Sequence, residues 1–465
     1  MEILVRDARE LPLSTTGSRP SPRLRVIVVG GGIAGAEAVL ALHALAGDRV
    51  ETTLVSTGPD LVYRPLAVAQ PFGLGQPHRY PLTELTEVAG ARLVQGTLAA
   101  VDAPRRSIRL ASGESLGYDA LVVTVGAHAV AAIEHATTWW PEGDPDAYGG
   151  LLRDLEEGYS RRVVFAVPVG AVWPLPIYEL ALMTARDVSG MGIDGAELTV
   201  VTPEAVPLGL FGAAAADAVA EELRTAGVGL ETASLARVVR QPALEVVLEP
   251  SGRRLPTDRV LAVPEVVGPR LPGLPHDADG FLPVDAHGRV RDTEGVWAAG
   301  DGIAYPVKYG GLATQQADAV AADVASLAGA AVAPEPARPR LTGVLMTGTR
   351  PRALGDAAGD AGDRPGPIWR PEGKVSGTYL TPYLAERYGA VADPGPKPSE
   401  GVLVEEVLPH ADAGPEPAFS ALRPAGSGSD QRLRGLGRRM HDYDAHLRQS
   451  DDLLRRGARP RSTDG

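Results

Sequence analysis

Three glycines near the start of the chain have the spacing of a nucleotide-binding turn. Gly30, Gly32 and Gly35 follow the apolar run of residues 24–29 and open a helical pattern, so they fit Gly-x-Gly-x-x-Gly between a strand and a helix. Such glycines allow a tight turn and the close approach of a pyrophosphate, and the helix N-terminus supplies N–H groups and positive potential. The pattern predicts a dinucleotide site.

The next strand departs from the usual ribose-binding pattern. It ends in Val55 and Ser56, where an aspartate or glutamate usually accepts hydrogen bonds from the ribose hydroxyls. Two alternatives remain open from the residues alone. Either Ser56 makes a weaker hydrogen bond to the ribose, or Asp60 reaches the same position.

A second strand-to-helix turn, FAVPVGAVWPLPIYELA (165–181), is poor in phosphate ligands. It holds one glycine, Gly170, and three prolines. Prolines have no backbone N–H, and N–H groups are what bind a phosphate in such a turn. We therefore expect a degenerate phosphate loop. Glu204 follows the apolar strand 197–203, where it can bind ribose hydroxyls, although a surface carboxylate is the more ordinary interpretation.

Composition excludes several kinds of chemistry. The 465 residues include no cysteine, which excludes a redox disulfide, cysteine-ligated metal sites and a persulfide-carrying thiol. A net charge of −13 argues against nucleic-acid binding, and no spacing of His, Asp and Glu suggests a metal site. The N-terminus lacks the pattern of a signal peptide, and no stretch approaches the roughly 18 apolar residues of a membrane span. We expect a cytoplasmic protein.

Two further motifs identify the dinucleotide by resemblance. GVWAAGD (295–301) resembles the second flavin motif of the two-dinucleotide-domain flavoproteins, the pyridine nucleotide-disulfide oxidoreductase superfamily. In that superfamily the residue corresponding to Asp301 holds the ribityl chain, and the one corresponding to Gly300 lets the backbone approach the phosphate. LVVTVGA (121–127) resembles the middle element, in which Gly126 returns the chain past the cofactor. The resemblance implies FAD at the first site. Asp301 is also expected to cap the following helix.

The flavin-proximal segments resemble those of type II NADH dehydrogenases and sulfide:quinone reductases, over about residues 24–335. The loop around Pro65 is similar to theirs, as is the run from Lys308 to Gln316. In those families an Ala-x-Gln-Gln string borders the quinone pocket, which places Gln315 and Gln316 there by resemblance. Lys308 is the candidate for stabilising negative charge on the reduced flavin.

The electron donor is the open question. Glu179-Leu180-Ala181 resembles the helix start of the NADH dehydrogenases, whereas the proline loop resembles the longer loop of the sulfide-oxidising enzymes. Those enzymes use redox cysteines, which this chain lacks. We expect an FAD-dependent oxidoreductase that takes electrons from weakly bound NAD(P)H or another small reductant and passes them to a quinone or other diffusible acceptor. A non-catalytic flavin-binding sensor or scaffold is the alternative. Trp173 and Tyr178 either form the donor-side wall or are core aromatics.

Alternating apolar strands and helical patterns predict an α/β fold with two Rossmann-like (glutathione-reductase-type) dinucleotide-binding domains and a smaller C-terminal region. The expected organisation is a flexible leader at 1–23, a discontinuous FAD-binding domain at 24–127 and 272–335, an NAD(P)-binding-like domain at 128–271, a C-terminal domain at 336–410, a linker at 411–429 and a C-terminal helix at 430–458.

The expected C-terminal helix carries a narrow apolar stripe, because apolar residues recur at steps of three and four from Leu433 to Leu454, apart from one skipped place at Ser450. Basic helices of related quinone reductases contact the membrane, and a peripheral contact is one interpretation here. The stripe has no Trp or Phe, however, and Asp451 and Asp452 interrupt its positive face. We therefore favour packing on a twin subunit, as a homodimer, or on the protein's own acidic surface.

Overall fold

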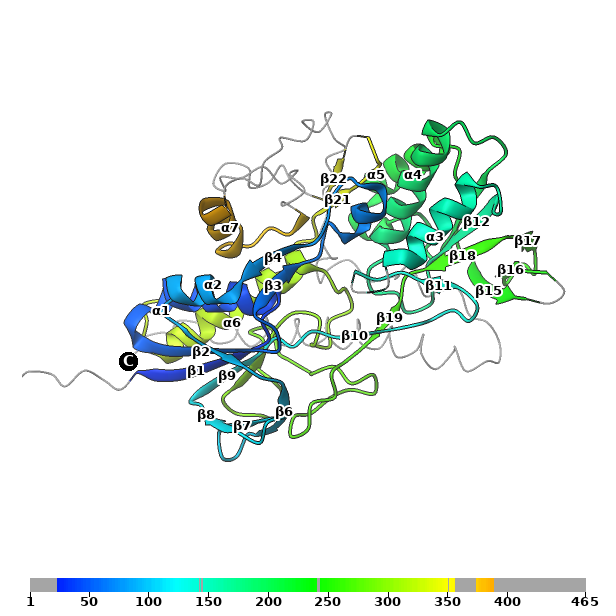
Figure 1. Ribbon diagram of the computed structural model, residues 1–465. Helices are drawn as coiled ribbons and strands as arrows, with labels where there is room; N and C mark the ends of the chain where they lie inside the picture. The colour runs from blue at the N-terminus through cyan, green and yellow to red at the C-terminus, as the bar shows by residue number, and fades with distance from the viewer. Residues whose placement is uncertain are drawn as a thin grey trace, which may run out of the picture.

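The computed structural model describes residues 23–388 apart from 142, 144, 241–242, 350 and 356–373. The expected linker at 411–429 and C-terminal helix at 430–458 lie outside the described residues, as does most of the expected leader. The described chain forms two α/β units, each built on a five-stranded sheet (Figure 1).

The first sheet is parallel and carries the glycine turn. Its strands, in spatial order, are β20 (Val296–Ala298), β9 (Ala120–Val123), β1 (Leu24–Val29), β2 (Val50–Ser56) and β5 (Arg92–Gln95). The last four residues of β1 are buried, as expected for a strand covered on both faces. On one face α1 (Ile33–Ala46) packs along α6 (Gly310–Leu327) and contacts α2 (Leu82–Val88). A separate antiparallel sheet follows β5, formed by β6 (Leu98–Asp102), β7 (Ser107–Leu110) and β8 (Ser115–Gly117).

The second sheet is also parallel, which confirms the predicted pair of Rossmann-like units. Its order is β11 (Thr137–Thr138), β18 (Arg259–Ala262), β12 (Arg162–Ala166), β13 (Glu197–Val201) and β14 (Gly229–Glu231). The helices α3 (Pro145–Glu156), α4 (Leu175–Gly190) and α5 (Ala213–Thr225) accompany this sheet (Figure 1). A small antiparallel sheet extends from it, formed by β15 (Leu235–Val239), β16 (Glu245–Glu249) and β17 (Arg254–Pro256).

Two antiparallel strands join the units. The chain leaves the first unit through β10 (His128–Val130) and returns through β19 (Glu265–Val267), which pairs with β10. One continuous cluster of buried side chains includes Val29 of the first sheet and Phe165 of the second. Because this core is shared, the facing ends of the two sheets are held against each other.

Shorter elements surround these units. A hairpin of β3 (Asp60–Tyr63) and β4 (His78–Pro81) follows β2, and a hairpin of β21 (Gly343–Leu345) and β22 (Arg352–Leu354) follows α6. Three 3₁₀ helices occupy Gly47–Arg49 (η1), Ala67–Phe72 (η2) and Gly209–Phe211 (η3), and the last described helix is α7 (Leu380–Tyr388).

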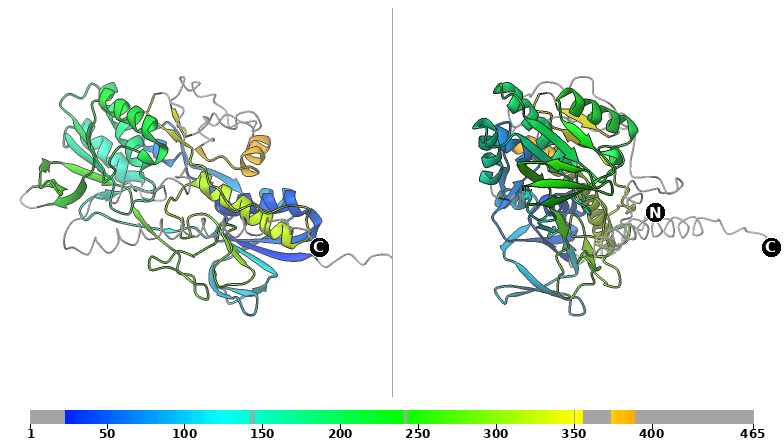
Figure 2. Two further views of the ribbon diagram at one scale, coloured as in Figure 1. Left: turned by 180° about the vertical axis from the view of Figure 1, so that it is seen from behind. Right: turned by 90° about the vertical axis from the view of Figure 1, so that its right-hand side faces the viewer.

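The last described segment, residues 374–388, is tied to the first unit. The Glu37 carboxylate on α1 accepts hydrogen bonds from the N–H groups of Tyr379 (2.8 Å) and Leu380 (2.7 Å) at the start of α7. Arg387 near the end of α7 forms a 2.9 Å ion pair with Glu84 on α2. The left view of Figure 2 shows α7, in orange, near the helices of the first unit, and α7 contacts α1. This segment therefore belongs to the wall of the first unit although it is distant in sequence.

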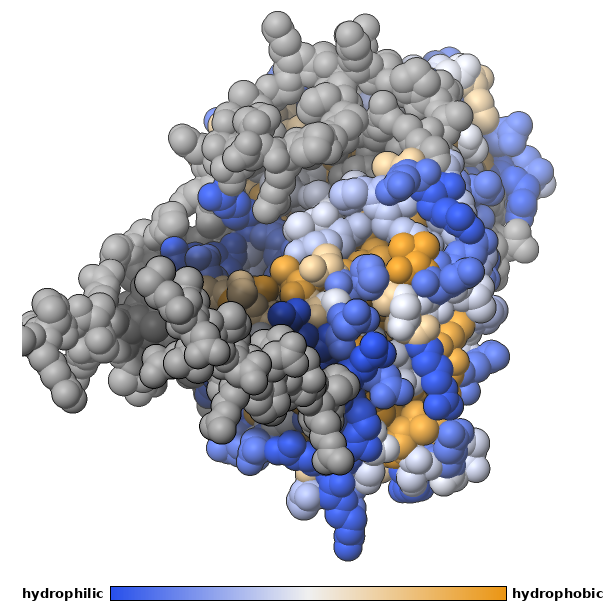
Figure 3. All heavy atoms as spheres, turned by 90° about the vertical axis from the view of Figure 1, so that its left-hand side faces the viewer, coloured by the Kyte–Doolittle hydropathy of each residue, from blue (hydrophilic) through white to orange (hydrophobic). Residues whose placement is uncertain are grey.

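No helix among the described residues is long and apolar enough to cross a membrane. The large apolar side chains that are exposed are scattered over separate elements, for example Val88, Met191 and Leu327. Figure 3 shows one face, on which apolar residues form separate patches among hydrophilic ones. Scattered apolar residues of this kind are normal on a protein surface.

Candidate functional site

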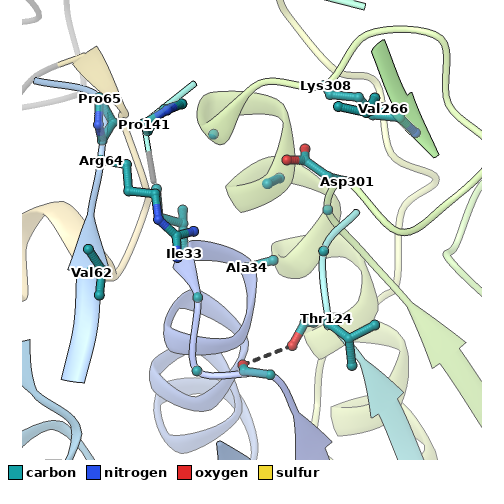
Figure 4. Close-up of a pocket in the computed structure, with 18 of the residues that line it drawn as sticks. Ile33, Ala34, Val62, Arg64, Pro65, Thr124, Pro141, Val266, Asp301 and Lys308 are labelled. Carbon is teal, nitrogen blue, oxygen red and sulfur yellow. Dashed lines mark hydrogen bonds between the residues drawn. The ribbon is translucent and has the colours of Figure 1, made fainter. Parts of the chain in front are cut away.

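A cavity of about 770 Å³ lies where the two units meet. Its walls come from the glycine turn after β1, the loop after β20, the start of α6, the loops at the carboxyl ends of the second sheet and the segment 374–375. Ligands of open parallel sheets bind at the carboxyl ends of the strands, and this size is typical of a small-molecule site. Figure 4 shows part of the lining, with Asp301 pointing into the cavity.

The glycine turn is shaped to bring its backbone to a ligand. A Cβ atom on Gly35 would lie 1.8 Å from the carbonyl oxygen of Gly30, so only glycine fits there. A Cβ on Gly32 would meet no atom within 4 Å and would point into open space. The Thr124 hydroxyl donates to the Gly30 carbonyl (3.1 Å) and fixes the turn (Figure 4). The open space beside Gly32, at the N-terminus of α1, is the place that a pyrophosphate needs.

Both candidates for the ribose end line the cavity. Ser56 at the end of β2 is buried, and its side chain lies against the backbone of Gly31. Asp60 on β3 also lines the cavity and lies 3.9 Å from Arg79, an ion pair. The two alternatives from the sequence are therefore both sterically available.

The loop after β20 is held from behind by α6. The N–H of Gly300 donates a 2.9 Å hydrogen bond to Oε1 of Gln316, which is buried. This bond orients the turn so that Gly300 and Asp301 line the cavity, together with Pro65 and Gly126. The helix α6 begins at Gly310 with Tyr309 as its N-cap, so the expectation that Asp301 caps this helix is wrong. Asp301 is instead oriented toward the cavity.

These features fit FAD. The open space at Gly32, the buried Ser56 and the carboxylate of Asp301 form one continuous lining, from the glycine turn to the start of α6. In this arrangement the turn would hold the pyrophosphate and Asp301 would accept hydrogen bonds from the ribityl chain, as the motif resemblance implies.

Lys308 enters the cavity from the loop before α6. Its ammonium donates to the Ile303 carbonyl and lies 4.0 Å from the centre of the Phe281 ring. Burial lowers the pKa of Lys308 to about 7, although Asp301 and Asp277 oppose this shift. Lys308 can therefore gain or lose a proton near neutral pH at the cavity wall.

The buried Lys308 predicts a particular pH dependence of stability. An unfolded lysine titrates near pH 10.5, and the folded state favours the neutral amine down to about pH 7. Lowering the pH from 10 to 7 should therefore reduce the free energy of unfolding of the wild-type protein by an amount on the order of a few kcal/mol, with no further loss from this group below pH 7. Lys308→Met should lack this slope. Urea titrations of the flavin-free proteins at a series of pH values measure it, and parallel pH profiles would contradict the prediction.

Aromatic side chains form the wall that faces the second unit. The Trp173 ring, in the loop before α4, stacks on the Tyr309 ring with centroids 4.5 Å apart and planes 17° apart. Phe211 contacts the Trp173 ring edge to face at 5.7 Å. Trp173 and Tyr309 both line the cavity, so Trp173 is a wall residue as well as a packed aromatic.

A buried ion pair closes the cavity beside this stack. The Lys374 ammonium lies 2.6 Å from Oε1 of Glu179 on α4, and the Met346 N–H donates to the same oxygen at 2.8 Å. Burial raises the pKa of Glu179, and the positive charge of Lys374 opposes that shift. Glu179 thus lies at the cavity wall, on the side where the sequence predicts the donor.

Four expected site residues lie elsewhere among the described residues. Tyr178 is fully buried and donates to Oε2 of Glu204 at 2.5 Å, while the Thr202 hydroxyl donates to the same oxygen at 2.9 Å. Burial raises the pKa of Glu204 to about 7. Neither Tyr178 nor Glu204 lines the cavity, and Glu204 is not the surface carboxylate of the ordinary interpretation, because its side chain turns inward to satisfy Tyr178.

The two glutamines also differ from their expected position at the pocket. The amide of Gln315 donates to the Arg340 carbonyl (2.9 Å) and accepts from the Arg340 N–H (2.8 Å), so it fixes the segment after α6. Gln316 holds Gly300, and neither side chain lines the cavity. The two glutamines therefore position backbone segments near the site, and their side chains do not themselves form its wall.

Sequence reasoning missed Lys374, Tyr309 and Arg64, which all line the cavity. Lysine scarcity offered a signal for the first, because the chain has only three lysines and Lys374 is one of them. Arg64 directly precedes Pro65 and lies beside Ile33 at the start of α1 (Figure 4). No local pattern distinguishes Tyr309 from a core tyrosine.

Comparison with solved structures shows the same fold at low identity. The sulfide:quinone oxidoreductase of Aquifex aeolicus has a TM-score of 0.61 and 19% identity, over 71% of this chain and 83% of that one. The ferredoxin reductase of the CYP199A2 system of Rhodopseudomonas palustris has a TM-score of 0.53 and 20% identity, over 72% and 83%. Putidaredoxin reductase in its covalent complex with putidaredoxin gives 0.52 and 19%, over 70% and 79%.

The model of the family "Pyridine nucleotide-disulphide oxidoreductase" matches residues 24–152 and 180–323, more than half of the chain. The interruption contains β12 and the proline loop, which is the part that departs from a phosphate-binding turn. Members of the family bind FAD and use NAD(P)H as substrate. This chain belongs to the pyridine nucleotide-disulphide oxidoreductase family, and it is an FAD-dependent oxidoreductase.

Proposed function

We propose that this protein passes electrons through FAD from a small reductant to a quinone or other diffusible acceptor without redox cysteines, and that NAD(P)H binds to it only weakly. The observation that carries this proposal is the loop between β12 and α4. This loop occupies the place of the second phosphate site but presents few N–H groups to a phosphate.

The backbone of this loop explains why so few N–H groups are available to a phosphate. Pro174 is the N-cap of α4, Pro176 lies in the first turn and lacks an N–H, and the N–H of Ile177 is already bonded to the Pro174 carbonyl at 3.0 Å. A helix N-terminus binds a phosphate through such free N–H groups. At the Gly170 turn, moreover, the Glu265 carboxylate lies 3.5 Å from the position of a Cβ on Gly170. A negative charge there opposes a phosphate.

The ribose position of the second unit is also occupied by the protein itself. Glu204 lies where a carboxylate receives the ribose hydroxyls, but its Oε2 already accepts from Tyr178 and Thr202. Exposing it to a nucleotide would require breaking these buried hydrogen bonds, which is unfavourable. NAD(P)H as the main electron donor is the second candidate, favoured by the family match over residues 180–323.

Bound FAD supplies the electron-accepting ring, so the protein needs no nucleophile of its own. The residues of this chain orient the cofactor and control its surroundings. Asp301 and the glycine turn fix its position, and the Trp173–Tyr309 stack excludes water from the wall toward the second unit. Lys308 provides a positive charge or a proton at the cavity wall near neutral pH. The quinone acceptor is suggested by the resemblance to the Aquifex aeolicus enzyme, which its description names a sulfide:quinone oxidoreductase.

Rapid anaerobic mixing tests the proposal. The oxidised holoenzyme is mixed with NADH, NADPH or sulfide, and flavin bleaching is followed at roughly 450 nm. We expect the bleaching rate with NADH and NADPH to rise linearly with concentration without saturation, because a collision complex forms in place of a bound one. For each reductant that bleaches the flavin, addition of 1,4-naphthoquinone should restore the absorbance, because the quinone takes two electrons from the reduced flavin.

Two outcomes would contradict the proposal. Saturation of the bleaching rate at micromolar NADH or NADPH would show an intact dinucleotide site and refute weak binding. Failure of all three reductants to bleach the flavin would refute turnover with these donors and favour a flavin-binding sensor.

A further inference from the structure

Residues 374–380 connect the two units at the cavity, and we call this segment the clasp. The Lys374 ammonium pairs with Glu179 of the second unit at 2.6 Å, while the Lys374 carbonyl accepts from the Tyr309 hydroxyl in the loop before α6. Lys374 and Val375 both line the cavity. From there the clasp continues along the first unit and ends at the start of α7. One short segment is therefore bonded to both units beside the cavity.

Val375 covers the place where the helices that follow two of the flavin motifs begin. A Cβ on Gly310, the first residue of α6, would lie 2.7 Å from a methyl carbon of Val375 and 3.3 Å from Cδ1 of Ile33, the first residue of α1. Val375 thus packs against the N-termini of both helices. Because all three residues line the same cavity, the clasp would enclose a bound FAD on this side.

Few hydrogen bonds hold the middle of the clasp. The Val375 N–H donates to the Tyr63 hydroxyl at 3.3 Å, and the Ser376 carbonyl accepts from the Thr314 hydroxyl on α6 at 2.8 Å. The backbone of residues 374–379 is irregular and pairs with neither sheet. A segment of this kind can detach by local opening at a lower free-energy cost than the unfolding of a whole unit.

The end of the clasp is anchored on a buried carboxylate. Glu37 on α1 is 0% exposed and accepts from the N–H groups of Tyr379 and Leu380. A Cβ on Gly377 would lie 2.3 Å from Oε2 of Glu37, so the clasp backbone passes directly over this carboxylate. Neither Glu37 nor Thr314 lines the cavity. Substitutions at these two positions therefore loosen the clasp without changing the cavity wall.

We propose that the clasp controls the exchange of FAD. The cofactor enters and leaves the cavity only while residues 374–380 are detached, and Glu37 and Thr314 keep the clasp closed. This inference goes beyond the proposed function, because it concerns how the flavin is retained and not which donor or acceptor reacts with it. The rate of FAD release should then follow the population of the open clasp.

Release of labelled FAD measures this rate without turnover. Holoprotein loaded with radiolabelled FAD is mixed with an excess of unlabelled FAD, and the label retained on a filter is counted over time. We expect Glu37→Met to release FAD at least about tenfold faster than the wild type, because the N–H groups of Tyr379 and Leu380 lose their acceptor. Thr314→Val keeps the side-chain volume but loses the bond to Ser376, so its release should be about threefold to tenfold faster.

Asp323→Asn is the matched control. Asp323 is also a buried carboxylate, on the same helix as Thr314, and its partners Arg289 and Trp297 lie outside both the clasp and the cavity lining. This variant weakens the first unit elsewhere, so we expect it to release FAD at the wild-type rate. Release as fast as that of Glu37→Met would show that general destabilisation of the first unit frees the cofactor, and it would overturn the inference.

An engineered disulfide tests the opposite change. The chain has no cysteine, so Gly310→Cys combined with Val375→Cys introduces its only pair of thiols. A Cβ on Gly310 would lie 2.7 and 3.5 Å from the two methyl carbons of Val375, within reach of a disulfide, whose Cβ atoms are about 3.5–4.5 Å apart. Oxidation of this holoprotein should slow FAD release at least about tenfold relative to the same protein treated with dithiothreitol, because the clasp can no longer detach.

Equal release rates of the oxidised and reduced forms, with the disulfide confirmed by thiol titration, would overturn the inference. Wild-type release rates in both Glu37→Met and Thr314→Val would overturn it as well, and these two variants decide the question if the double cysteine variant binds no FAD. A flavin that no reductant bleaches would refute the proposed function and would leave these release rates unaffected.

Discussion

Replacing Gly32 with valine should yield a folded protein that has lost its FAD. The backbone of Gly32 is extended (φ −83°, ψ −170°), a conformation open to any residue, and a Cβ there meets no protein atom within 4 Å. The added side chain would instead occupy the space of the pyrophosphate at the N-terminus of α1. We expect less than about a tenth of the wild-type flavin content, because this is the close approach that the motif requires. The ratio of flavin to protein absorbance measures it.

Gly35→Val is the matched comparison, because its side chain would clash with the protein itself and not only with the bound cofactor. Its Cβ would lie 1.8 Å from the Gly30 carbonyl oxygen, so the turn or the helix must shift. This variant should lose both flavin and stability, visible as a lowered thermal midpoint of the flavin-free protein. Gly32→Val should keep that midpoint. A Gly32→Val protein that purifies with full FAD would contradict the assignment of this turn.

Removing the charge of Lys374 should cause the largest loss of stability among single changes at the cavity. Lys374→Met leaves the buried Glu179 without its cation, and unpaired buried charges of this kind cost about 3–5 kcal/mol. The Met346 N–H remains as a partner of Glu179, and it only partly compensates. Urea unfolding at pH 8 measures the difference in free energy.

The pH dependence of the free energy of unfolding distinguishes the unpaired charge of Glu179 from a loss of packing at Lys374. Burial already raises the pKa of Glu179, and loss of Lys374 removes the main opposing influence. A raised folded pKa means that stability is highest below the unfolded pKa, near 4.5, and is lost as the pH rises toward the folded pKa. The deficit of Lys374→Met should therefore be smaller at pH 5 than at pH 8.

A double variant supplies the control. Glu179→Gln combined with Lys374→Met removes both charges and should recover much of the stability at pH 8, because no buried charge is left unpaired. A deficit that is the same at pH 5 and pH 8, and that the double variant does not reduce, would show that Lys374 stabilises the fold by packing alone.

Local sequence patterns predicted the flavin half of the site because that half is formed by backbone turns, each of which is specified by a few neighbouring residues. Gly30, Gly32 and Gly35 lie within six residues, so their spacing alone specifies the strand, the turn and the helix start. Asp301 was likewise found through its own short motif, and the structure turns its side chain into the cavity. The alternation of strands and helices predicted the two parallel sheets for the same reason.

Features that depend on distant partners could not be predicted in this way. Glu179 and Lys374 are 195 positions apart, and nothing near either residue indicates the other. The inward turn of Glu204 depends on Tyr178, which lies on the helix across the strand end. Gln316 carries the motif of a pocket residue, but packing of α6 against the loop after β20 directs its amide to the Gly300 N–H. In each case the sequence supplied the residue type, and tertiary packing decided its partner.

The position of β20 at the edge of the first sheet constrains the order in which a nascent chain can fold. β9 ends at Val123, but its outer neighbour β20 begins only at Val296, and Lys374 and Val375 of the cavity wall come later still. While the ribosome synthesises the intervening residues, β9 is an unpaired edge, which is prone to pairing with other chains. The second unit can close during this interval, because all its strands lie between Thr137 and Ala262. FAD can therefore bind only late in synthesis. A product truncated before residue 296 would contain the glycine turn but would lack β20 and the loop after it, so it should not retain FAD.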